Sequence, residues 1–516
     1  MPDPTFIAER KDDLIAIVLT HAHEDHLGAV AHLWPRLECP VYATPFTAAI
    51  LRRKLEEAGL LDRVPVNEVT YGEALALGPF TVTYLGITHS IPEGSSLAIR
   101  TDAGTILHTG DWKLDPEPLV GTATDEAAFR TLGDDGVLAM VCDSTNVFSP
   151  GSSGSEAAVR NSLMELVDGR TGRVAITTFA SNVARVATAA AVAQAHEREL
   201  VVIGRSLLRT IEAAQSVGYL SGLPTVLSVA EAAYLPRERV LLLCTGCQGE
   251  PRGAMARIAD GEHPDVALET GDLVIFSSKI IPGNEAPIGR MVNLLVEAGV
   301  EILTEDDHFV HVSGHPGREE LAELYSWVRP EISVPVHGEA RHLAEHVAYA
   351  KRLGVPHCVL VSNGAVVRLA PGPAEIVDHV GTGRLALDGG NLVHPDSAAL
   401  RARKRLMHHG YVSVTLVMDS EGALLTVPRV NPHGVAEHRE GALARGIEAA
   451  LVQVVEALAT SHLRDDLAVE NAVRRQVNQI VRPATGKRPL VDVDIVRLPP
   501  AAYESRPGYF SGGLGR

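Results

Sequence analysis

The feature that most constrains this chain is a short histidine-rich loop near its start. The loop, Thr20–His26 with the sequence THAHEDH, follows an apolar run over 14–19 that predicts a buried β-strand, and residues 27–33 predict a helix. Imidazole and carboxylate together are typical ligands of Zn²⁺ and similar divalent ions, and their closeness favours two ions over one. A merely polar loop at a strand end is the alternative. The candidate ligands in the loop are His21, His23, Asp25 and His26.

A centre with two ions needs more ligands than this loop supplies, and three later side chains can complete it. His89, Asp111 and His337 each come shortly after an apolar segment that predicts a strand. Any one of them alone is more often an ordinary loop residue. Together with the first loop they predict that four separate strand ends converge on one site.

Composition limits what the chain can bind. The net charge is −18, from 46 Lys and Arg against 64 Asp and Glu, which argues against broad adhesion to nucleic acid but not against a local substrate channel. No apolar run is long enough for a membrane span, and the first residues lack the pattern of a secretory signal. The five cysteines form no disulfide framework, which predicts a reducing cytoplasm.

Several further segments carry a resemblance to a known family. Together with the loop they resemble the β-CASP branch of the metallo-β-lactamase superfamily and, within it, the bacterial ribonuclease J family. The resemblance covers nearly the whole chain. The segments are Cys142–Asn146, Thr177–Asn182, Gly204–Ser206, Thr245–Pro251, Pro282–Glu285, Val312–His315 and Val336–Glu339.

The resemblance implies an α/β fold in several domains. Strands and helices alternate along most of the chain, and the βαβ rhythm from about residue 156 predicts a parallel α/β domain of its own. We expect a metallo-β-lactamase αββα sandwich, truncated at its N-terminus, that is interrupted by a β-CASP domain. The expected segments are the sandwich (1–152 and 326–372), the insertion (153–325), a linker (373–398) and a C-terminal α+β domain (399–516).

Within the C-terminal domain the sequence predicts strands at 410–418, 422–427 and 490–497 and helices near 439–460 and 466–481. The first of these helices has one apolar face. That face either packs within its own domain or makes a subunit contact. The apolar residues are Ile447, Ala450, Leu451, Val454, Val455 and Leu458.

The resemblance also implies two ligand sets and a bridging carboxylate. Asp111 would bridge two divalent ions, expected to be Zn²⁺ with Mn²⁺ and Mg²⁺ as alternatives. The first set is His21, His23, His89 and Asp111, and the second is Asp25, His26, Asp111 and His337.

Further residues match the family's positions around the scissile phosphate. Asp143 and His315 would move protons and offset phosphate charge, and they are counted with Asp25 as catalytic. The alternatives are an Asx-turn for Asp143 and an ordinary polar residue before a helix for His315. The implied RNA contacts are Ser181, Asn182, Ser313, Gly314 and His315.

The function implied is that of a cytoplasmic metal-dependent ribonuclease. It would cut RNA internally and also degrade it 5′→3′ from a monophosphorylated end, as a homodimer or homotetramer without membrane partners. The open alternatives are a β-CASP DNA nuclease, a small-molecule metallo-hydrolase, and a truncated, non-catalytic RNA-binding scaffold. A separate motif, His342–His346 (HLAEH), fits the inverted zincin pattern of metalloproteases.

The chain departs from the family at its start. Only about thirteen residues precede the strand at 14–19, whereas family members begin with several strands and an Asp that braces the loop. We therefore expect part of one sheet to have no counterpart, either because the start codon lies further upstream or because the form is truncated. In the second case an exposed core face would weaken the fold.

Overall fold

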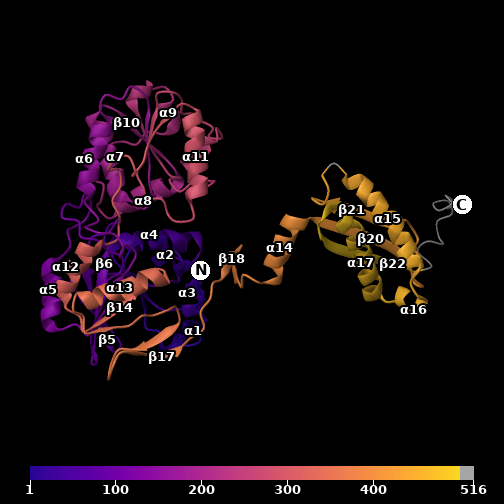
Figure 1. Cartoon of the computed structure of the whole chain (residues 1–516), viewed down its shortest axis with the longest axis horizontal. Helices are drawn as coiled ribbons and strands as arrows, with labels where there is room; N and C mark the ends of the chain where they lie inside the picture. Colours follow the sequence, from indigo (N-terminus) through magenta and orange to yellow (C-terminus); the bar gives the residue numbers. More distant parts are fainter. Residues whose placement is uncertain (438, 500–516) are drawn as a thin grey trace. The chain divides into compact units, whose positions relative to one another are not determined.

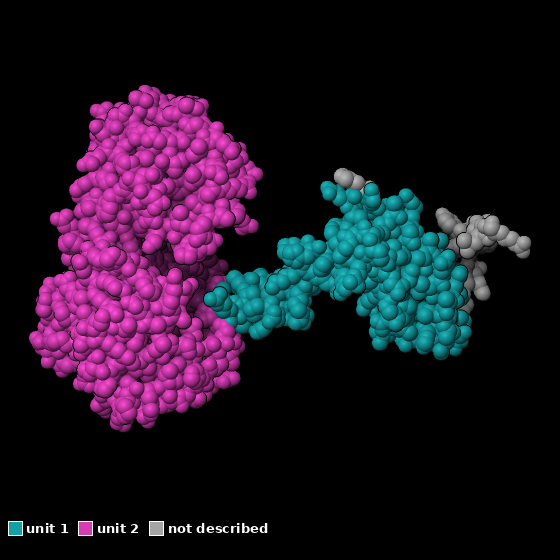
Figure 2. All heavy atoms as spheres, in the orientation of Figure 1, with its two compact units in different colours: residues 1, 384–516 teal, residues 2–383 magenta. Residues whose placement is uncertain are grey.

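The computed structural model describes residues 1–437 and 439–499, so the predicted C-terminal domain extends beyond the described residues. The chain divides into two compact units, residues 2–383 and residue 1 with 384–516 (Figure 2), and each is described by itself. The predicted α/β class is confirmed. Among the described residues, no helix has both the length and the apolar character needed to cross a membrane.

The larger unit is built around a mixed sheet of seven strands. The strand order is β15-β14-β8-β7-β6-β5-β4. β7, β8, β14 and β15 run parallel, and β4 to β7 form antiparallel pairs. The strands are β4 (Ala74–Leu77), β5 (Phe80–Gly86), β6 (Ser95–Thr101), β7 (Gly104–His108), β8 (Ala139–Asp143), β14 (Ile332–Val336) and β15 (His357–Cys358).

A smaller sheet of three parallel strands packs against the first. Tyr84 of β5 is fully buried between the sheets, and its hydroxyl donates to the Tyr42 carbonyl at 3.0 Å. The strands are β1 (Ile17–Val18), β2 (Val41–Ala43) and β3 (Val66–Glu68), with β1 at one edge. The expectation about strands upstream of β1 stays a prediction.

Helices cover the outer faces of both sheets and complete the αββα sandwich. One core joins the three-stranded sheet to α3 (Val30–Leu37) and α4 (Pro45–Glu57). A second core joins the seven-stranded sheet to α5 (Glu126–Asp135), α12 (Arg318–Val328) and α13 (Ala340–Arg352). Apolar burial on both sides of each sheet fixes the strand ends on which the candidate ligands lie.

The predicted β-CASP insertion is confirmed as a separate α/β domain between β8 and β14. Its five strands are all parallel, in the order β10-β11-β9-β12-β13. In Figure 1, α6 and α7 lie on one side of this sheet and α11 lies on the other. The sequences of these strands are continuous apolar runs, because helices cover both faces of the sheet. The elements are β9 (Val174–Thr177), β10 (Glu199–Ile203), β11 (Val240–Cys244), β12 (Leu273–Phe276), β13 (Glu301–Leu303), α6 (Glu156–Val167), α7 (Val183–Ala195), α8 (Arg205–Ser216), α9 (Val229–Ala232), α10 (Ala254–Ala259) and α11 (Glu285–Glu297).

Buried charges join the insertion to the sandwich. The Lys113 ammonium lies 2.9 Å from Asp115 and donates to the Gly154 carbonyl at 3.2 Å. Asp115 accepts from the backbone N–H of Glu156 at 2.9 Å, and Glu156 pairs with the buried Arg185 at 2.9 Å. Each charge is hydrogen-bonded, so this polar chain orients the start of the insertion without leaving an unpaired buried ion.

The smaller unit contains a three-stranded sheet covered by two helices. β20 (Tyr411–Asp419) pairs with β22 (Leu490–Leu498) in parallel and with β21 (Arg429–His433) in antiparallel orientation. The apolar face of α15 (Glu440–Glu456) packs on this sheet together with α17 (Asp466–Thr485). Ile447, Leu451 and Val455 of α15 are at most 1% exposed in that core, so this part of the face packs within its own domain, whereas Ala450, Val454 and Leu458 are partly exposed.

Two predicted segments differ in the structure. The strand predicted at 422–427 is wrong: a turn at Gly422, with φ of 96°, returns the chain to β20, and the strand begins only at Arg429. Leu424 makes no more than an isolated bridge to Met418. The stretch predicted as a linker, 373–398, contains three short strands. β17 (Glu375–His379) pairs with β16 (Ala365–Arg368), which lies just before this stretch, and β18 (Ala386–Asp388) pairs with β19 (Asn391–Val393), both in antiparallel orientation.

Candidate metal centre

The histidine-rich loop changes its backbone conformation after β1. His23 is extended, with φ of −70° and ψ of 152°, and caps the short helix α2 (Glu24–Leu27). Asp25 and His26 lie in that helix, whereas His21 precedes it. Because extended and helical residues project in different directions, one loop contributes side chains to two neighbouring ligand groups.

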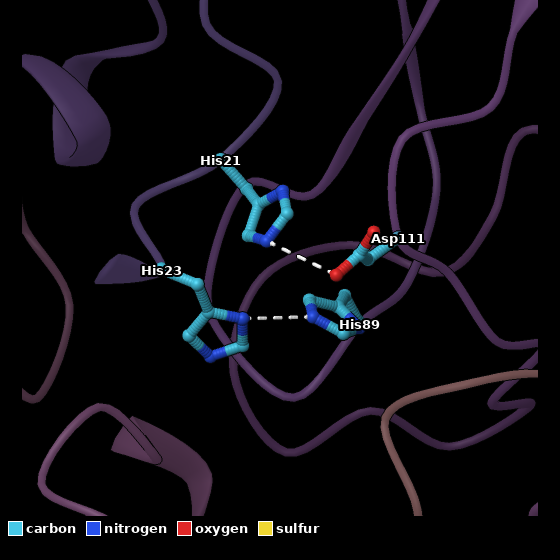
Figure 3. A group of neighbouring side chains, drawn as sticks. All are labelled: His21, His23, His89 and Asp111. Atoms are coloured by element: carbon cyan, nitrogen blue, oxygen red, sulfur yellow. Dashed lines mark hydrogen bonds and ion pairs between the residues drawn. The ribbon is translucent and has the colours of Figure 1, made fainter. Parts of the chain in front are cut away.

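The first group joins the loop to the residues that follow β5 and β7 (Figure 3). Its ligand atoms all lie within 4.8 Å of one another. His89 Nε2 is 2.9 Å from His23 Nδ1, and His21 Nε2 is 3.8 Å from Asp111 Oδ2. The three imidazoles and the carboxylate therefore enclose a common point, as the sequence predicts for His21, His23, His89 and Asp111.

Neighbouring groups orient the imidazoles of the first group. His89 Nδ1 donates to the Gly314 carbonyl at 2.6 Å, and His21 Nδ1 lies 3.0 Å from Thr20 Oγ1. A side chain at Gly314 would collide with Ser90 and with the His89 ring. The buried His21 Nε2 has no hydrogen-bond partner among the described residues. An orphaned buried nitrogen facing a carboxylate and two further imidazoles fits a cation, so the donor set suits a divalent metal.

Burial makes the histidines of the first group neutral. It holds the pKa of His21 and of His89 well below the usual range and lowers that of His23 to about 4. Desolvation disfavours the imidazolium form, and the neighbouring histidines add to this effect on His21 and His89. These imidazoles can therefore coordinate a metal near neutral pH without first losing a proton.

The second group is Asp25, His26, Asp111 and His337, again with all ligand atoms within 4.8 Å. His26 Nε2 is 3.1 Å from Asp111 Oδ2, and His337 Nε2 is 3.4 Å from the same oxygen. Asp111 therefore belongs to both groups, as predicted. His337 has a left-handed backbone with φ of 58°, which is strained for a residue with a side chain.

The second group is charged and open to solvent. Its Asp25 side chain is 62% exposed and its His337 side chain 32%, whereas Asp111 is 4% exposed. Although burial lowers it, hydrogen bonds to Asp111 and Asp25 raise the pKa of His26 to about 10. The hydrogen bond to Asp25 raises the pKa of His337 to about 9. Without a metal, two imidazolium ions thus balance the carboxylates.

Asp143 and His315 come together beside these groups. His315 Nδ1 lies 2.7 Å from Asp143 Oδ2. Burial opposes both shifts, but the pairing raises the pKa of His315 and lowers that of Asp143. Asp143 Oδ1 also accepts from the Thr145 N–H at 2.8 Å. Asp143 therefore forms the Asx-turn that was the alternative prediction and also lies beside the ligand groups.

Sequence reasoning missed the role of Thr145. Its hydroxyl lies 2.7 Å from Asp143 Oδ1 and 2.8 Å from His337 Nδ1, so it joins the pair to the second ligand group. Asp111, Asp143, His315 and His337 form a third cluster of ligand atoms. The signal available in the sequence was that Thr145 lies inside the family-like segment Cys142–Asn146.

Family models match four successive parts of the chain. Residues 2–129 match "Beta-lactamase superfamily domain", and residues 171–295 match "Ribonuclease J, beta-CASP domain". Residues 299–360 match "Zn-dependent metallo-hydrolase RNA specificity domain", and residues 398–498 match "Ribonuclease J C-terminal domain".

Curated relatives extend the match to most of the chain. The chain is 43% identical to "Ribonuclease J" of Sinorhizobium meliloti over 96% of this chain and 89% of that protein. It is 38% identical to "Ribonuclease J" of Mycolicibacterium smegmatis over the same shares. It is 34% identical to "Ribonuclease J 1" of Streptococcus pyogenes over 95% and 88%.

The chain belongs to the ribonuclease J family. It is a metal-dependent hydrolase with RNA as its substrate, and the clustered ligand atoms agree with the use of a divalent metal. The predicted family and function are confirmed, which makes a small-molecule or DNA substrate unnecessary to explain the site.

The predicted RNA contacts fall into two kinds. Ser313 Oγ accepts from Asn146 Nδ2 at 2.7 Å and from the His315 N–H at 3.1 Å, which fixes the turn beside Gly314. Asn182 is 4% exposed, and its side chain caps α7 and donates to Glu156. Ser181, one residue earlier, is partly exposed. Their contacts with RNA stay predictions, and the Asn182 side chain already has protein partners.

The metalloprotease alternative at His342–His346 is wrong. His346 is fully buried, and its two ring nitrogens lie 2.8 Å from Ser144 Oγ and 3.0 Å from the Tyr325 hydroxyl. Neither histidine joins a metal-ligand group among the described residues.

Proposed function

We propose that the chain binds two divalent ions, most suitably Zn²⁺, and hydrolyses RNA both internally and in the 5′→3′ direction. The proposal rests on two complete ligand groups that share one carboxylate. His21, His23, His89 and Asp111 would hold one ion, and Asp25, His26, Asp111 and His337 the other. Three imidazoles in the first group favour Zn²⁺, whereas a site richer in oxygen ligands would favour Mn²⁺ or Mg²⁺.

The residues around the ligands supply positioning and proton transfer. When bound, divalent cations make a nucleophile available near neutral pH and offset the charge of a phosphate. Asp143 raises the pKa of His315, and the His315 Nε2 has no hydrogen-bond partner among the described residues, so when protonated it can donate to a phosphate oxygen or to the leaving oxygen. Asp143 holds the His315 ring and stabilises its positive charge. Asp25 anchors His337 at 3.3 Å.

We further propose a preference for RNA with a 5′-monophosphate. Gly314 must remain a glycine for steric reasons, and we expect the backbone of the turn at Ser313 and Gly314 to contact the 5′-phosphate. Ser181 and Asn182 would support the strand from the insertion. A 5′-triphosphate adds bulk and charge at that end, which a pocket fitted to one phosphate disfavours.

The preference can be tested with RNAs that differ only in their 5′ group. Strands carrying a label at the 3′ end and either a monophosphate or a triphosphate at the 5′ end are incubated with the metal-loaded protein. We expect faster degradation of the monophosphorylated strand, with mononucleotides released in order from that end. Equal rates with only internal cuts would reject the 5′-end pocket while leaving the ribonuclease activity itself in place.

Cytoplasmic action and self-assembly complete the proposal. The five cysteines are all free thiols, as in proteins of a reducing compartment. Because Ile447, Leu451 and Val455 of α15 are buried within their own domain, we expect a homodimer or homotetramer to form through exposed surfaces of that domain. Light scattering on the full chain and on a form lacking 399–516 tests this. We expect the full chain to be dimeric or larger and the shortened form to be monomeric, and a monomeric, active full chain would contradict it.

A further inference from the structure

The accessible side of the metal centre lies at its second ligand group. The side chains of Asp25 and His337 are exposed by 62% and 32%, whereas those of His21 and Asp111 are buried. If the chain acts as proposed above, an RNA strand must approach from the side of Asp25 and His337. The surface next to His337 is therefore the place to look for contacts with nucleotides beside the scissile phosphate.

The turn that carries His337 packs directly on the first turn of α13. A Cβ placed on Gly338 would lie 2.8 Å from the Cβ of His342 and 3.5 Å from that of Ser144. His342 Nδ1 accepts the Glu339 N–H at 3.2 Å, which fixes the ring. His342 thus forms the wall next to the ligand turn and is itself partly exposed.

An exposed aromatic ring lies next to His342 on the same surface. Phe148 is 49% exposed, and its ring centre lies 5.4 Å from that of His342 at an interplanar angle of 64°. The Arg341 guanidinium lies 5.9 Å from the centre of the Phe148 ring, and its side chain is 70% exposed. An exposed aromatic ring that meets an imidazole at 64° and has a cation over it has the composition of a base-stacking platform.

The backbone around Phe148 is fixed from both sides. The Val147 carbonyl accepts from Arg318 Nε at 2.8 Å, and the Ser149 carbonyl accepts from the Arg318 N–H at 3.0 Å. Arg318 is in turn paired with Glu345 of α13 at 2.5 Å. The ring is therefore held on an ordered loop, and stacking on it costs little conformational entropy.

We propose that Phe148, His342 and Arg341 form a nucleobase-binding subsite for the RNA strand next to the scissile phosphate. A base stacks on Phe148 against the His342 edge, and Arg341 contacts an adjoining phosphate. The overall charge of −18 makes long-range attraction of RNA weak, so affinity must come from local contacts of this kind. The subsite rests on the proposed ribonuclease function and adds recognition of a base to it.

The test compares single-turnover cleavage of a short labelled RNA by metal-loaded full-length variants. Phe148→Leu keeps apolar volume but removes the ring, and we expect the half-saturating protein concentration to rise roughly 5- to 150-fold, the range for loss of one base–aromatic stack. Phe148→Trp should restore tight binding. Phe80→Leu is the matched control, because Phe80 is 41% exposed at the start of β5, away from the ligand loops.

Two further measurements separate stacking from other roles. A series of RNAs is prepared in which one nucleotide lacks its base, at a different position in each RNA. We expect the loss of binding caused by Phe148→Leu to become smaller only when the abasic nucleotide occupies one particular position. Arg341→Gln should lower the slope of log Kd against log salt by about one, whereas Phe148→Leu should leave that slope unchanged. An effect of Phe148→Leu that is the same for every abasic RNA would overturn the subsite, as would wild-type binding by that variant. Failure of the wild-type chain to cleave RNA would instead reject the proposed function.

Discussion

The two ligand groups share Asp111 but differ in burial and charge. In the first group, burial keeps His21, His23 and His89 neutral, and an unpartnered nitrogen already faces the carboxylate. In the second group, His26 and His337 are protonated and paired with carboxylates at a partly exposed surface. The first group is thus prepared for a cation, while the second must exchange protons for one.

The difference assigns distinct tasks to the two groups. A buried, neutral set binds its ion firmly and supports the fold around it. An exposed, charged set faces the incoming phosphate, and its ion is easier to lose. The order in which the two groups bind metal, and the pH dependence of that binding, therefore test whether the two groups differ in this way.

The largest expected effect comes from removing the shared carboxylate. Asp111→Ala should lower the rate of RNA hydrolysis at least about a thousandfold, corresponding to roughly 4 kcal/mol of transition-state stabilisation, because both groups lose a ligand. Rate measurements under saturating metal test this. Asp102→Ala, at an exposed position between β6 and β7, is the matched control. Substantial residual activity in Asp111→Ala would show that the groups work independently of this residue.

Substitutions in the pair of His315 and Asp143 should lower the activity of the protein without removing the first ion. His315→Gln and Asp143→Asn are each expected to lower kcat by about 10²- to 10⁴-fold, the usual range for a general acid or its partner. Steady-state kinetics combined with metal analysis checks this. If metal content fell in step with activity, the third cluster of ligand atoms would bind an ion, and Asp143 and His315 would be ligands instead.

The pH dependence of metal binding should distinguish the groups. The folded, metal-free pKa values of His26 and His337 are raised to about 10 and 9, so protons compete with the metal throughout the neutral range. Affinity of the second group should therefore rise with pH, by up to tenfold per unit for each proton displaced, and level off above about pH 10. The first group should show little change between pH 6.5 and 8.5. Calorimetric titrations in buffers of different ionisation enthalpy count the protons, and equal proton release from both groups would contradict the comparison.

Two threonines offer the smallest and most selective test. Thr20→Val removes the hydroxyl beside His21, and Thr145→Val removes the one beside His337. Loss of such an orienting partner typically costs 10- to 100-fold in metal affinity or activity. Thr20→Val should weaken the first ion and Thr145→Val the second. If both variants weakened the two ions in the same way, the hydroxyls would support the fold as a whole instead of orienting one ligand group each.

Local sequence patterns predicted which side chains come together, because each of them lies shortly after a strand. The parallel and antiparallel strands of one sheet bring His89, Asp111 and His337 to the loop from distant parts of the chain, and the family-like motifs identified which ones. Hydrogen bonds across the fold were harder to foresee. Nothing local distinguishes Thr145 from its neighbours until β8 and β14 are paired, because its second partner is 192 residues away.

Patterns that depend on tertiary packing were ambiguous from sequence. The HxxEH spacing in α13 looks like a metal motif until His346 is seen to be buried against Tyr325 and Ser144. The apolar run at 422–427 has strand-like composition, but after the turn at Gly422 it makes only an isolated bridge to β20, and the neighbouring segment forms β21. The exposure of Phe148 could likewise not be read from its residue type.

Counting bound ions in intact variants tests whether two ions share Asp111. Native mass spectrometry of the zinc-loaded chain at pH 8 should find two ions in the wild type and one each in His23→Ala and His337→Ala. In Asp111→Ala, both ions should be bound more weakly than in the wild type. The ion kept by His337→Ala should persist on acidification to pH 6.5, whereas the ion kept by His23→Ala should be lost. A fully active wild-type chain with no more than one ion would contradict the account.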